Sequence, residues 1–239
     1  MPSCLPADLV DPFIDTAKPR IRWVFTVFTA RPFGMVRLGP NTDPVGTWEA
    51  GYRYNSPRIH NFSHLHAWQL SGVPVMPVSG PPPDPARAPD WSSAFRHETE
   101  EAAPGYYAVT LDDPGVRAEI TASERVGFHR YRFPPNIPRY IVFDIGSELG
   151  PSEMSDAMAR VVSASEIEGF VENEVTTRRP KRCRVYFVAR FDRAFAHFVG
   201  WDASGRIAGL DQTGGKGCGA YVGFAPERGG TVQMKVGIS

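Results

Sequence analysis

The chain has 239 residues, and its 26 Lys and Arg residues balance its 26 Asp and Glu residues. A formal net charge of zero excludes the strong basic excess that nucleic-acid and membrane-surface proteins use against polyanionic partners. Hydrophobic residues make up 42% of the chain, which excludes a disordered protein, and 23 Gly with 23 Pro argue against a fold of long helices.

The N-terminal region, residues 1 to about 80, is aromatic and irregular. Met1–Pro12 contain no basic segment followed by an apolar run, so they carry no recognisable secretory signal. A proline-rich segment, residues 81–89, follows, and we expect an exposed loop that forms neither strand nor helix because proline lacks the N–H and fixes φ.

From about Trp91 onward, apolar and polar residues alternate with the period of two that is typical of strands. The predicted strands are Tyr106–Leu111, Val116–Ala122, Arg139–Gly146, Arg160–Ser165, Cys183–Phe191, Ala194–Trp201, Gly219–Phe224 and Thr231–Ile238. Only the short segment Ser152–Ala159 is predicted to be helical. Many short strands between turns predict an all-β fold, a sandwich or barrel.

Two strands have details that the structure can test. Near Gly127 the apolar and aromatic residues change from even to odd positions, and this change predicts a β-bulge or a tight turn. In Cys183–Phe191, Val185 and Phe187 share one face, while Tyr186 and Val188 on the other face indicate that both faces are partly buried.

His64 and His66 are two residues apart, so on a strand they would share a face and could bind one metal ion. A third ligand is missing, because Leu70 stands where a cupin-like site would have a carboxylate. We therefore interpret the pair as hydrogen-bonding histidines. Cys4, Cys183 and Cys218 show neither a disulfide framework nor a zinc spacing and are expected to be free thiols.

Two further segments were weighed as sites. His97–Glu101 gathers three carboxylates, as a glycosidase needs, but the neighbouring Ala-Ala-Pro-Gly favours a turn. Gly214–Gly219 lacks the spacing of a phosphate-binding loop, so it is interpreted as a flexible hairpin connection.

An ordered series of blocks resembles the N-terminal domain of glycoside hydrolase family 92, the calcium-dependent exo-α-mannosidases. The blocks are Val10–Thr16 (VDPFIDT), Arg31–Thr42 (RPFGMVRLGPNT), Gly51–Tyr54 (GYRY), Phe62–Gly72 (FSHLHAWQLSG), Met76–Pro77, Ser93–Val109 and Glu119–Tyr131. Asp15, Arg31 and Asn61 depart from the family pattern, in which Asp15 and Asn61 are glycines. These departures indicate a divergent branch.

The resemblance implies a single β-supersandwich of antiparallel strands over residues 1–239, similar to the galactose-mutarotase fold, with at most one or two short helices. In this family an (α/α)₆ barrel follows the sandwich and carries the catalytic acid and base and the calcium ion, and the substrate cleft lies between the two domains. We expect the barrel to be absent here, so that the chain has no catalytic residue and no metal site, is inactive alone, and meets calcium only with the missing catalytic domain. The family is usually secreted or periplasmic.

The resemblance also directs attention to carbohydrate. We expect Arg31, His64, His66, Trp68 and Gln69 to face the cleft and bind an α-mannoside or another carbohydrate, because aromatic faces stack on sugars and polar side chains bind hydroxyls. Packing in the core or against the barrel is the other interpretation, which we prefer for Phe33 and Phe62 and leave open for Trp68. The expected partners are the carbohydrate and the catalytic barrel, without nucleic acid or membrane. A free-standing carbohydrate-binding sandwich is the alternative function.

Overall fold

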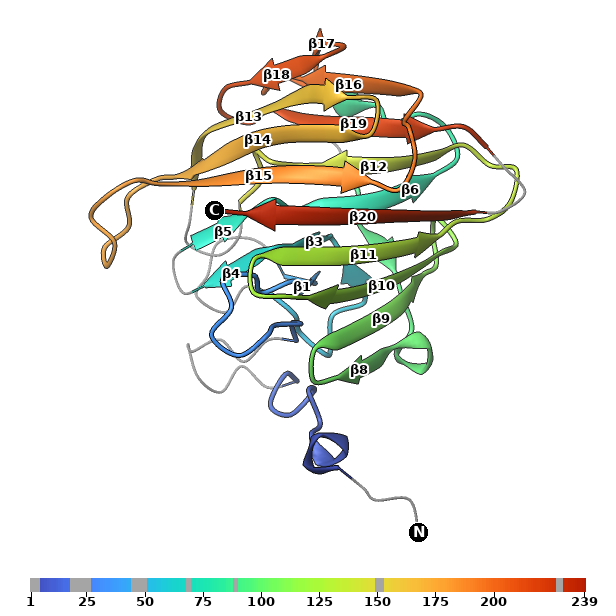
Figure 1. The fold of residues 1–239 in the computed structure, drawn as a ribbon, viewed down its shortest axis with the longest axis vertical. Helices are drawn as coiled ribbons and strands as arrows, with labels where there is room; N and C mark the ends of the chain where they lie inside the picture. Colours follow the sequence, from blue (N-terminus) through green and yellow to red (C-terminus); the bar gives the residue numbers. More distant parts are fainter. Residues whose placement is uncertain are drawn as a thin grey trace.

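The computed structural model describes residues 5–17, 27–43, 51–67, 70–87, 90–148, 153–226 and 230–239. This part of the chain is built from antiparallel strands, with three short 3-10 helices, η1 (Pro6–Leu9), η2 (Pro85–Arg87) and η3 (His97–Thr99), and no α-helix (Figure 1). The prediction of an all-β antiparallel sandwich is confirmed. Within these ranges no helix is long and apolar enough to cross a membrane.

Most strands belong to two large sheets. The seven-stranded sheet has the order β1 (Gly39–Asn41), β3 (Asn61–Ser63), β6 (Val75–Ser79), β12 (Arg139–Phe143), β19 (Gly219–Phe224), β16 (His197–Trp201) and β17 (Ile207–Gly209). The nine-stranded sheet has the order β18 (Gln212–Gly214), β13 (Met154–Ser163), β14 (Glu166–Asn173), β15 (Cys183–Phe191), β20 (Thr231–Ile238), β11 (Val126–Arg132), β10 (Val116–Ala122), β9 (Tyr106–Leu111) and β8 (Glu101–Ala103). Two small ribbons add β2 (Arg58–Ile59) with β7 (Ser93–Ala94), and β4 (Leu65–Ala67) with β5 (Leu70–Gly72).

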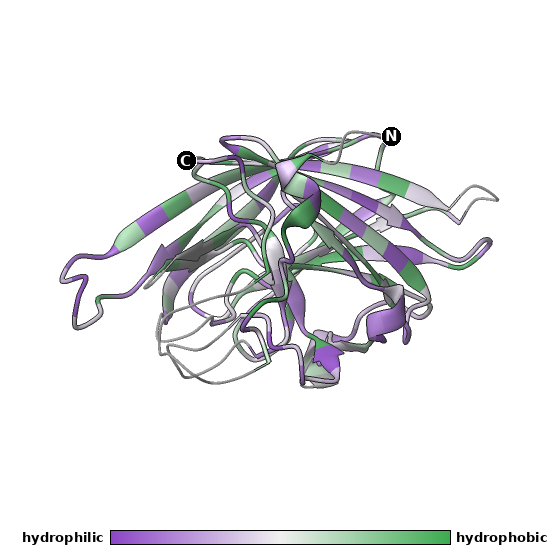
Figure 2. Cartoon of the chain, turned by 90° about the horizontal axis from the view of Figure 1, so that it is seen from below, coloured by the Kyte–Doolittle hydropathy of each residue, from purple (hydrophilic) through white to green (hydrophobic). Residues whose placement is uncertain are grey.

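The core fills the space between the two large sheets. Phe143 of β12 stacks on Phe187 of β15 with ring centroids 6.2 Å apart, and Phe191 of β15 contacts Phe224 of β19 at 5.3 Å. Figure 2 shows hydrophobic and hydrophilic residues alternating along the strands, as expected when each strand has one face in the core. This burial is the main source of stability of such a sandwich.

The hairpin β10–β11 explains why the apolar residues change from even to odd positions near Gly127. Ile120 pairs with His129 and Ala122 pairs with Gly127 in an uninterrupted register. Even residues of β10 and odd residues of β11 therefore share the inner face without a bulge. Of the two predicted features the tight turn is present, because residues 123–125 join the strands and the Ser123 N–H donates to the Val126 carbonyl at 2.9 Å. Gly127 is needed for another reason, since a Cβ there would lie 2.8 Å from the ring of His64.

The segment predicted to be helical belongs to a strand. Met154–Ser163 forms β13, and a register shift between Met154 and Asp156 interrupts its pairing with β14. Because of that shift, the buried residues are Met154, Ala157 and Ala159. A spacing of three between the first two imitates a helical period.

Three smaller expectations also change. Tyr186 and Val188 are 53% and 41% exposed, so the outer face of β15 is open rather than partly buried. The glycine-rich segment 215–218 joins β18 to β19, which lie in different sheets, and so is not a hairpin. The proline-rich segment forms the 3-10 helix η2, and Pro83 and Pro85 are buried, because a fixed φ near −65° suits the start of such a turn.

Candidate functional site

Several of the sequence blocks meet around the buried carboxylate of Glu100. The Tyr52 hydroxyl donates to its Oε2 at 3.0 Å, the Tyr107 hydroxyl donates to its Oε1 at 2.5 Å, and His97 Nδ1 lies 2.5 Å from its Oε2. The Glu100 side chain is 1% exposed. Buried and bonded to three groups of this chain, Glu100 joins three segments and presents almost no surface to a substrate.

This arrangement sets the protonation of the two phenols. Burial, with the charge of Glu100 as the second cause, raises the pKa of both Tyr52 and Tyr107 above the ordinary value. Both tyrosines therefore stay protonated and act as donors at neutral pH.

An aromatic cluster covers the Glu100 carboxylate on its outer side. Tyr54 stacks on His97 with ring centroids 3.8 Å apart, and Phe13 contacts both Tyr52 and Tyr54 at 5.8 Å. Thr16 fixes the first block, since its hydroxyl donates to the Phe13 carbonyl. Phe13, Tyr54 and His97 are each only partly buried, so this cluster offers aromatic surface to a ligand or a second domain.

The first block also keeps its backbone despite one substitution. Asp15 replaces the family's glycine and has a φ of 61°. Aspartate tolerates the left-handed region better than most residues, so the turn survives the change.

His64, which was expected to face the cleft, lies inside the fold with no exposed surface. Its Nδ1 is 2.6 Å from the Val73 carbonyl, and its Nε2 is 2.7 Å from His129 Nε2. His129 Nδ1 is 2.7 Å from the Tyr131 hydroxyl. Contacts of the His64 ring are therefore made within this chain, because its polar atoms are taken up by Val73 and His129.

The Val73 carbonyl at the end of this series of hydrogen bonds fixes where each proton lies. A carbonyl only accepts, so His64 Nδ1 donates to Val73, and a neutral His64 accepts at Nε2 from His129. Burial lowers the pKa of His64 to about 4 and lowers that of His129, the latter also because of His64. Both rings are neutral at pH 7, and the Tyr131 hydroxyl donates to His129.

Arg31 stands on an exposed turn that packs beside the His64 segment. The Gly34 N–H donates to the Arg31 carbonyl at 2.8 Å, the Met35 N–H donates to the Glu124 carbonyl at 2.7 Å, and the Arg31 guanidinium lies 3.6 Å from the Glu124 carboxylate. Phe33 at the tip has a φ of 62° and a fully exposed ring. Phe33 therefore does not pack in the core, and its packing against the barrel stays a prediction, whereas Phe62 is buried as expected.

The remaining predicted contacts lie in the hairpin β4–β5. His66 pairs through its backbone with Ser71. The side chain of His66, and Trp68 and Gln69 altogether, lie outside the described residues. Their roles stay predictions.

Sequence reasoning did not anticipate the partners that complete these clusters, Tyr52, Tyr107 and His129. His129 gave a signal in the alternation of β11, where it falls on the inner face between Gly127 and Tyr131. A histidine at a core position needs polar partners, and of the two that His129 has, Tyr131 is near in the sequence but His64 is 65 positions away.

The described ranges contain no group of three or more His, Cys, Asp or Glu side chains placed to hold a metal ion. Calcium binds six to eight oxygen ligands, so no calcium site is assigned to them. Of the cysteines, Cys183 is partly buried and Cys218 is buried, and burial raises the pKa of Cys218 to about 12. Cys218 is therefore a thiol rather than a thiolate, and Cys4 lies outside the described residues.

Comparison with known proteins identifies the same family that the sequence blocks indicate. The sequence profile described as the glycosyl hydrolase family 92 N-terminal domain matches residues 9–239. The family GH92 alpha-mannosidase BT3965 from Bacteroides thetaiotaomicron, solved in complex with mannoimidazole, is 27% identical, with a TM-score of 0.82 over 98% of this chain and 32% of that one. No curated protein matches the chain in sequence.

Two further solved structures share the fold. The GH92 family glycosyl hydrolase ccman5 is 23% identical, with a TM-score of 0.81 over 98% of this chain and 32% of its own. The family GH92 inverting mannosidase BT2199 from Bacteroides thetaiotaomicron is 19% identical, with a TM-score of 0.80 over 99% of this chain and 32% of its own. The chain thus spans about a third of the length of these relatives.

Proposed function

Because this chain belongs to glycosyl hydrolase family 92 and corresponds to the family's N-terminal domain, we propose that it forms one wall of a carbohydrate-binding cleft. The other wall is a catalytic barrel domain, which supplies the acid, the base and the calcium ion. An α-mannoside is the substrate class we assign, supported by the relative BT3965, an alpha-mannosidase solved with mannoimidazole.

We assign the wall to the Arg31 turn and the hairpin β4–β5. Arg31, His66, Trp68 and Gln69 contact the carbohydrate, whereas the buried His64 bonds to Val73 and His129 within the fold. The N–H of Arg37 donates to the His64 carbonyl at 3.0 Å, so the chain leaving the Arg31 turn runs directly beside the segment that enters β4.

The observation that carries this proposal is the placement of Phe33. A large apolar ring fully exposed on a turn of left-handed backbone gains nothing from burial in this chain and costs about 1–2 kcal/mol of backbone strain. Hydrogen bonds from Gly34 and Met35 nevertheless hold the turn in place. A ring held in this way suits contact with a partner surface, here the barrel or its sugar.

A kinetic assay tests whether catalysis requires the barrel domain. The 239-residue chain is incubated with calcium and an aryl α-mannoside. We expect no turnover above buffer, because inverting hydrolysis needs two carboxyl groups about 6.5–9.5 Å apart across the bond and we place these in the barrel. Turnover by the purified chain, with its identity checked by mass spectrometry, would contradict the proposal.

The alternative is a free-standing carbohydrate-binding module, which the exposed aromatic cluster of Phe13, Tyr54 and His97 favours. Calorimetric titration with mannose and a mannobiose separates the two. Affinity at the Arg31 turn or at the cluster without any barrel supports the module, and its absence there supports a wall that works only with its partner.

A further inference from the structure

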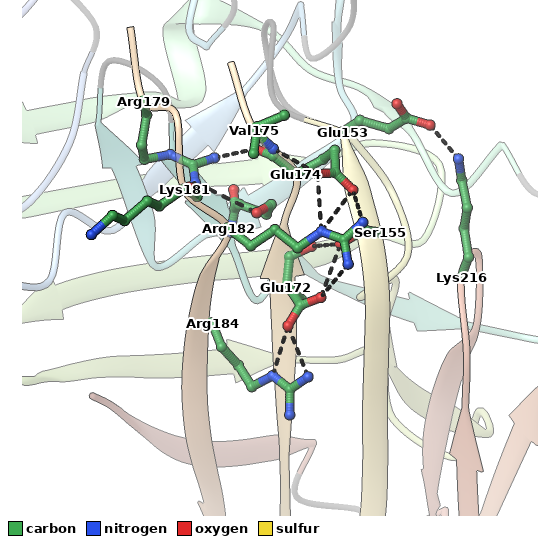
Figure 3. A network of polar contacts seen from close by, with 11 residues as sticks. Glu153, Ser155, Glu172, Glu174, Val175, Arg179, Lys181, Arg182, Arg184 and Lys216 are labelled. Carbon is green, nitrogen blue, oxygen red and sulfur yellow. Dashed lines mark hydrogen bonds and ion pairs between the residues drawn. The ribbon is translucent and has the colours of Figure 1, made fainter. Parts of the chain in front are cut away.

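The outer face of the nine-stranded sheet carries transverse rows of paired charges. Glu166 of β14 pairs with Arg190 of β15, and Glu172 pairs with Arg184 at 2.8 Å. Figure 3 shows the row at Glu172 and the neighbouring contacts of Glu174 with Arg182. Exposed pairs of this kind contribute little stability each, but they leave the face electrically balanced.

Between these rows lies a largely apolar patch, with Arg125, Arg160 and Glu168 at its edges, that we call the outer hollow. Strand register places Met158, Phe170 and Tyr186 side by side in one row, and Val126, Gly237 and Val188 in the next. These six residues contribute to the lining of a hollow of about 470 Å³. That volume is within the range of about 300–1,000 Å³ that small-molecule sites have.

Gly237 lines the outer hollow, and no contact among the described residues requires a glycine there. Its φ is not in the left-handed region, and a Cβ would find its nearest neighbour, the Arg125 carbonyl, only at 4.0 Å. A glycine inside a strand costs about 0.5–1 kcal/mol relative to alanine. A strand glycine with open space above it fits a place where an external group approaches the backbone closely.

The two rings that line the outer hollow, Phe170 and Tyr186, are held in fixed positions. The Arg184 guanidinium lies 4.0 Å from the centroid of Phe170, pairs with Glu172, and interacts with the Tyr186 hydroxyl. Phe170 and Tyr186 pack edge to face with centroids 6.1 Å apart. A ligand therefore meets a preformed aromatic platform and orders few side chains on binding.

The opposite edge of the outer hollow offers hydrogen-bonding groups without a net charge. Arg160 donates from Nε to Glu168 Oε1 at 2.8 Å, and their side chains are 56% and 33% exposed. A planar donor beside a planar acceptor suits the hydroxyl groups of a sugar. Arg160 and Glu168 compensate each other's charge, so this pair does not favour an isolated ion as the ligand.

We propose that the outer hollow binds a neutral saccharide, with the apolar face of a pyranose ring on Tyr186 and over Gly237, and its hydroxyls toward Arg160 and Glu168. The site is separate from the Arg31 turn, on the other side of the β10–β11 turn that contains Glu124. It goes beyond the proposed function, because it needs no second domain.

The test is NMR titration of the 239-residue chain with an α-linked mannotriose, with glucuronate as an anionic comparison. We expect amide shifts at Tyr186, Val188 and Gly237 with the mannotriose only. Gly237→Val puts a strand-favouring residue into the lining of the outer hollow and should abolish these shifts while keeping the thermal midpoint. Tyr186→Ala should weaken binding about tenfold, the loss of one aromatic contact.

Gln233→Val is the matched control, since it puts the same side chain on the same strand and face but outside the outer hollow. It should leave the affinity unchanged. Arg31→Ala should also leave it unchanged, because Arg31 does not line the outer hollow, so a failure of the cleft-wall proposal leaves this one standing. The proposal is overturned if Gly237→Val retains wild-type affinity, if shifts are absent from the hollow, or if sedimentation shows that a second copy of the chain covers it.

Discussion

The Nε2 atoms of His64 and His129 lie 2.7 Å apart inside the sandwich, although the residues are 65 positions apart in the chain. His64 follows β3 of the seven-stranded sheet and His129 belongs to β11 of the nine-stranded sheet. This contact therefore ties the two sheets together through a polar bond.

The first prediction concerns acid. Burial lowers the folded-state pKa of His64 to about 4, below its ordinary 6.5, so between these values the unfolded chain binds more protons than the folded one. The free energy of unfolding should fall as the pH drops from 6.5 toward 4, by about 3 kcal/mol from His64 alone. Urea unfolding at successive pH values measures this slope.

Two variants test whether His64 causes this pH dependence of the free energy of unfolding. His64→Gln should be less stable at pH 7 and lose much of the dependence between pH 6.5 and 4, because the titrating ring is gone. His60→Gln, outside the buried pair, should keep it. An unchanged slope in His64→Gln would refute the assignment.

The second prediction concerns Glu100. Tyr107→Phe removes one donor from a buried carboxylate and should lower the free energy of unfolding by about 1–3 kcal/mol. Glu98→Gln, at an exposed neighbour, should change it by less than about 0.5 kcal/mol. Equal effects of the two variants in chemical denaturation would show that Glu100 is not the buried acceptor described above.

The third prediction compares two glycines on adjacent strands that face opposite sides of the sheet. Gly127→Ala places a Cβ 2.8 Å from the His64 ring and 3.0 Å from Leu38, which should cost about 1–3 kcal/mol. Gly237→Ala meets only open space and should raise stability by about 0.5–1 kcal/mol. Thermal midpoints moving in the same direction would contradict this reading of the two faces.

The fourth prediction concerns Phe33. Phe33→Asn should stabilise the chain by up to about 1 kcal/mol, since asparagine tolerates the left-handed backbone that Phe33 adopts. Phe33→Ala keeps the strain and loses only an exposed ring, so its melting temperature should equal that of the wild type. A large loss of stability in the alanine variant would mean that the ring packs against this chain after all.

The strands with clean alternation were predictable from sequence. Tyr106–Leu111, Val116–Ala122 and Cys183–Phe191 have the expected bounds, because each has one apolar face and ends at turn residues. Ser152–Ala159 was mistaken for a helix because a register shift in β13 changes the spacing of its buried residues. Such an irregularity has no signature in composition.

The site was harder to predict because its bonds join distant segments. His64 was expected to face a cleft, and its burial depends on His129, which no local pattern links to it. Glu100 was expected to fix a turn, and it does adjoin η3, but its bonds to Tyr52 and Tyr107 depend on tertiary packing.

The position of β20 in the nine-stranded sheet has a consequence for synthesis on the ribosome. This strand pairs with β15 on one side and β11 on the other, yet it follows every other strand in the chain. Until residues 231–238 emerge, the nascent polypeptide holds two half-sheets with facing, unpaired edges, a state prone to wrong association. We therefore expect the nine-stranded sheet to close only after residues 231–238 have emerged, with the half-formed sheets as clients for a chaperone until then.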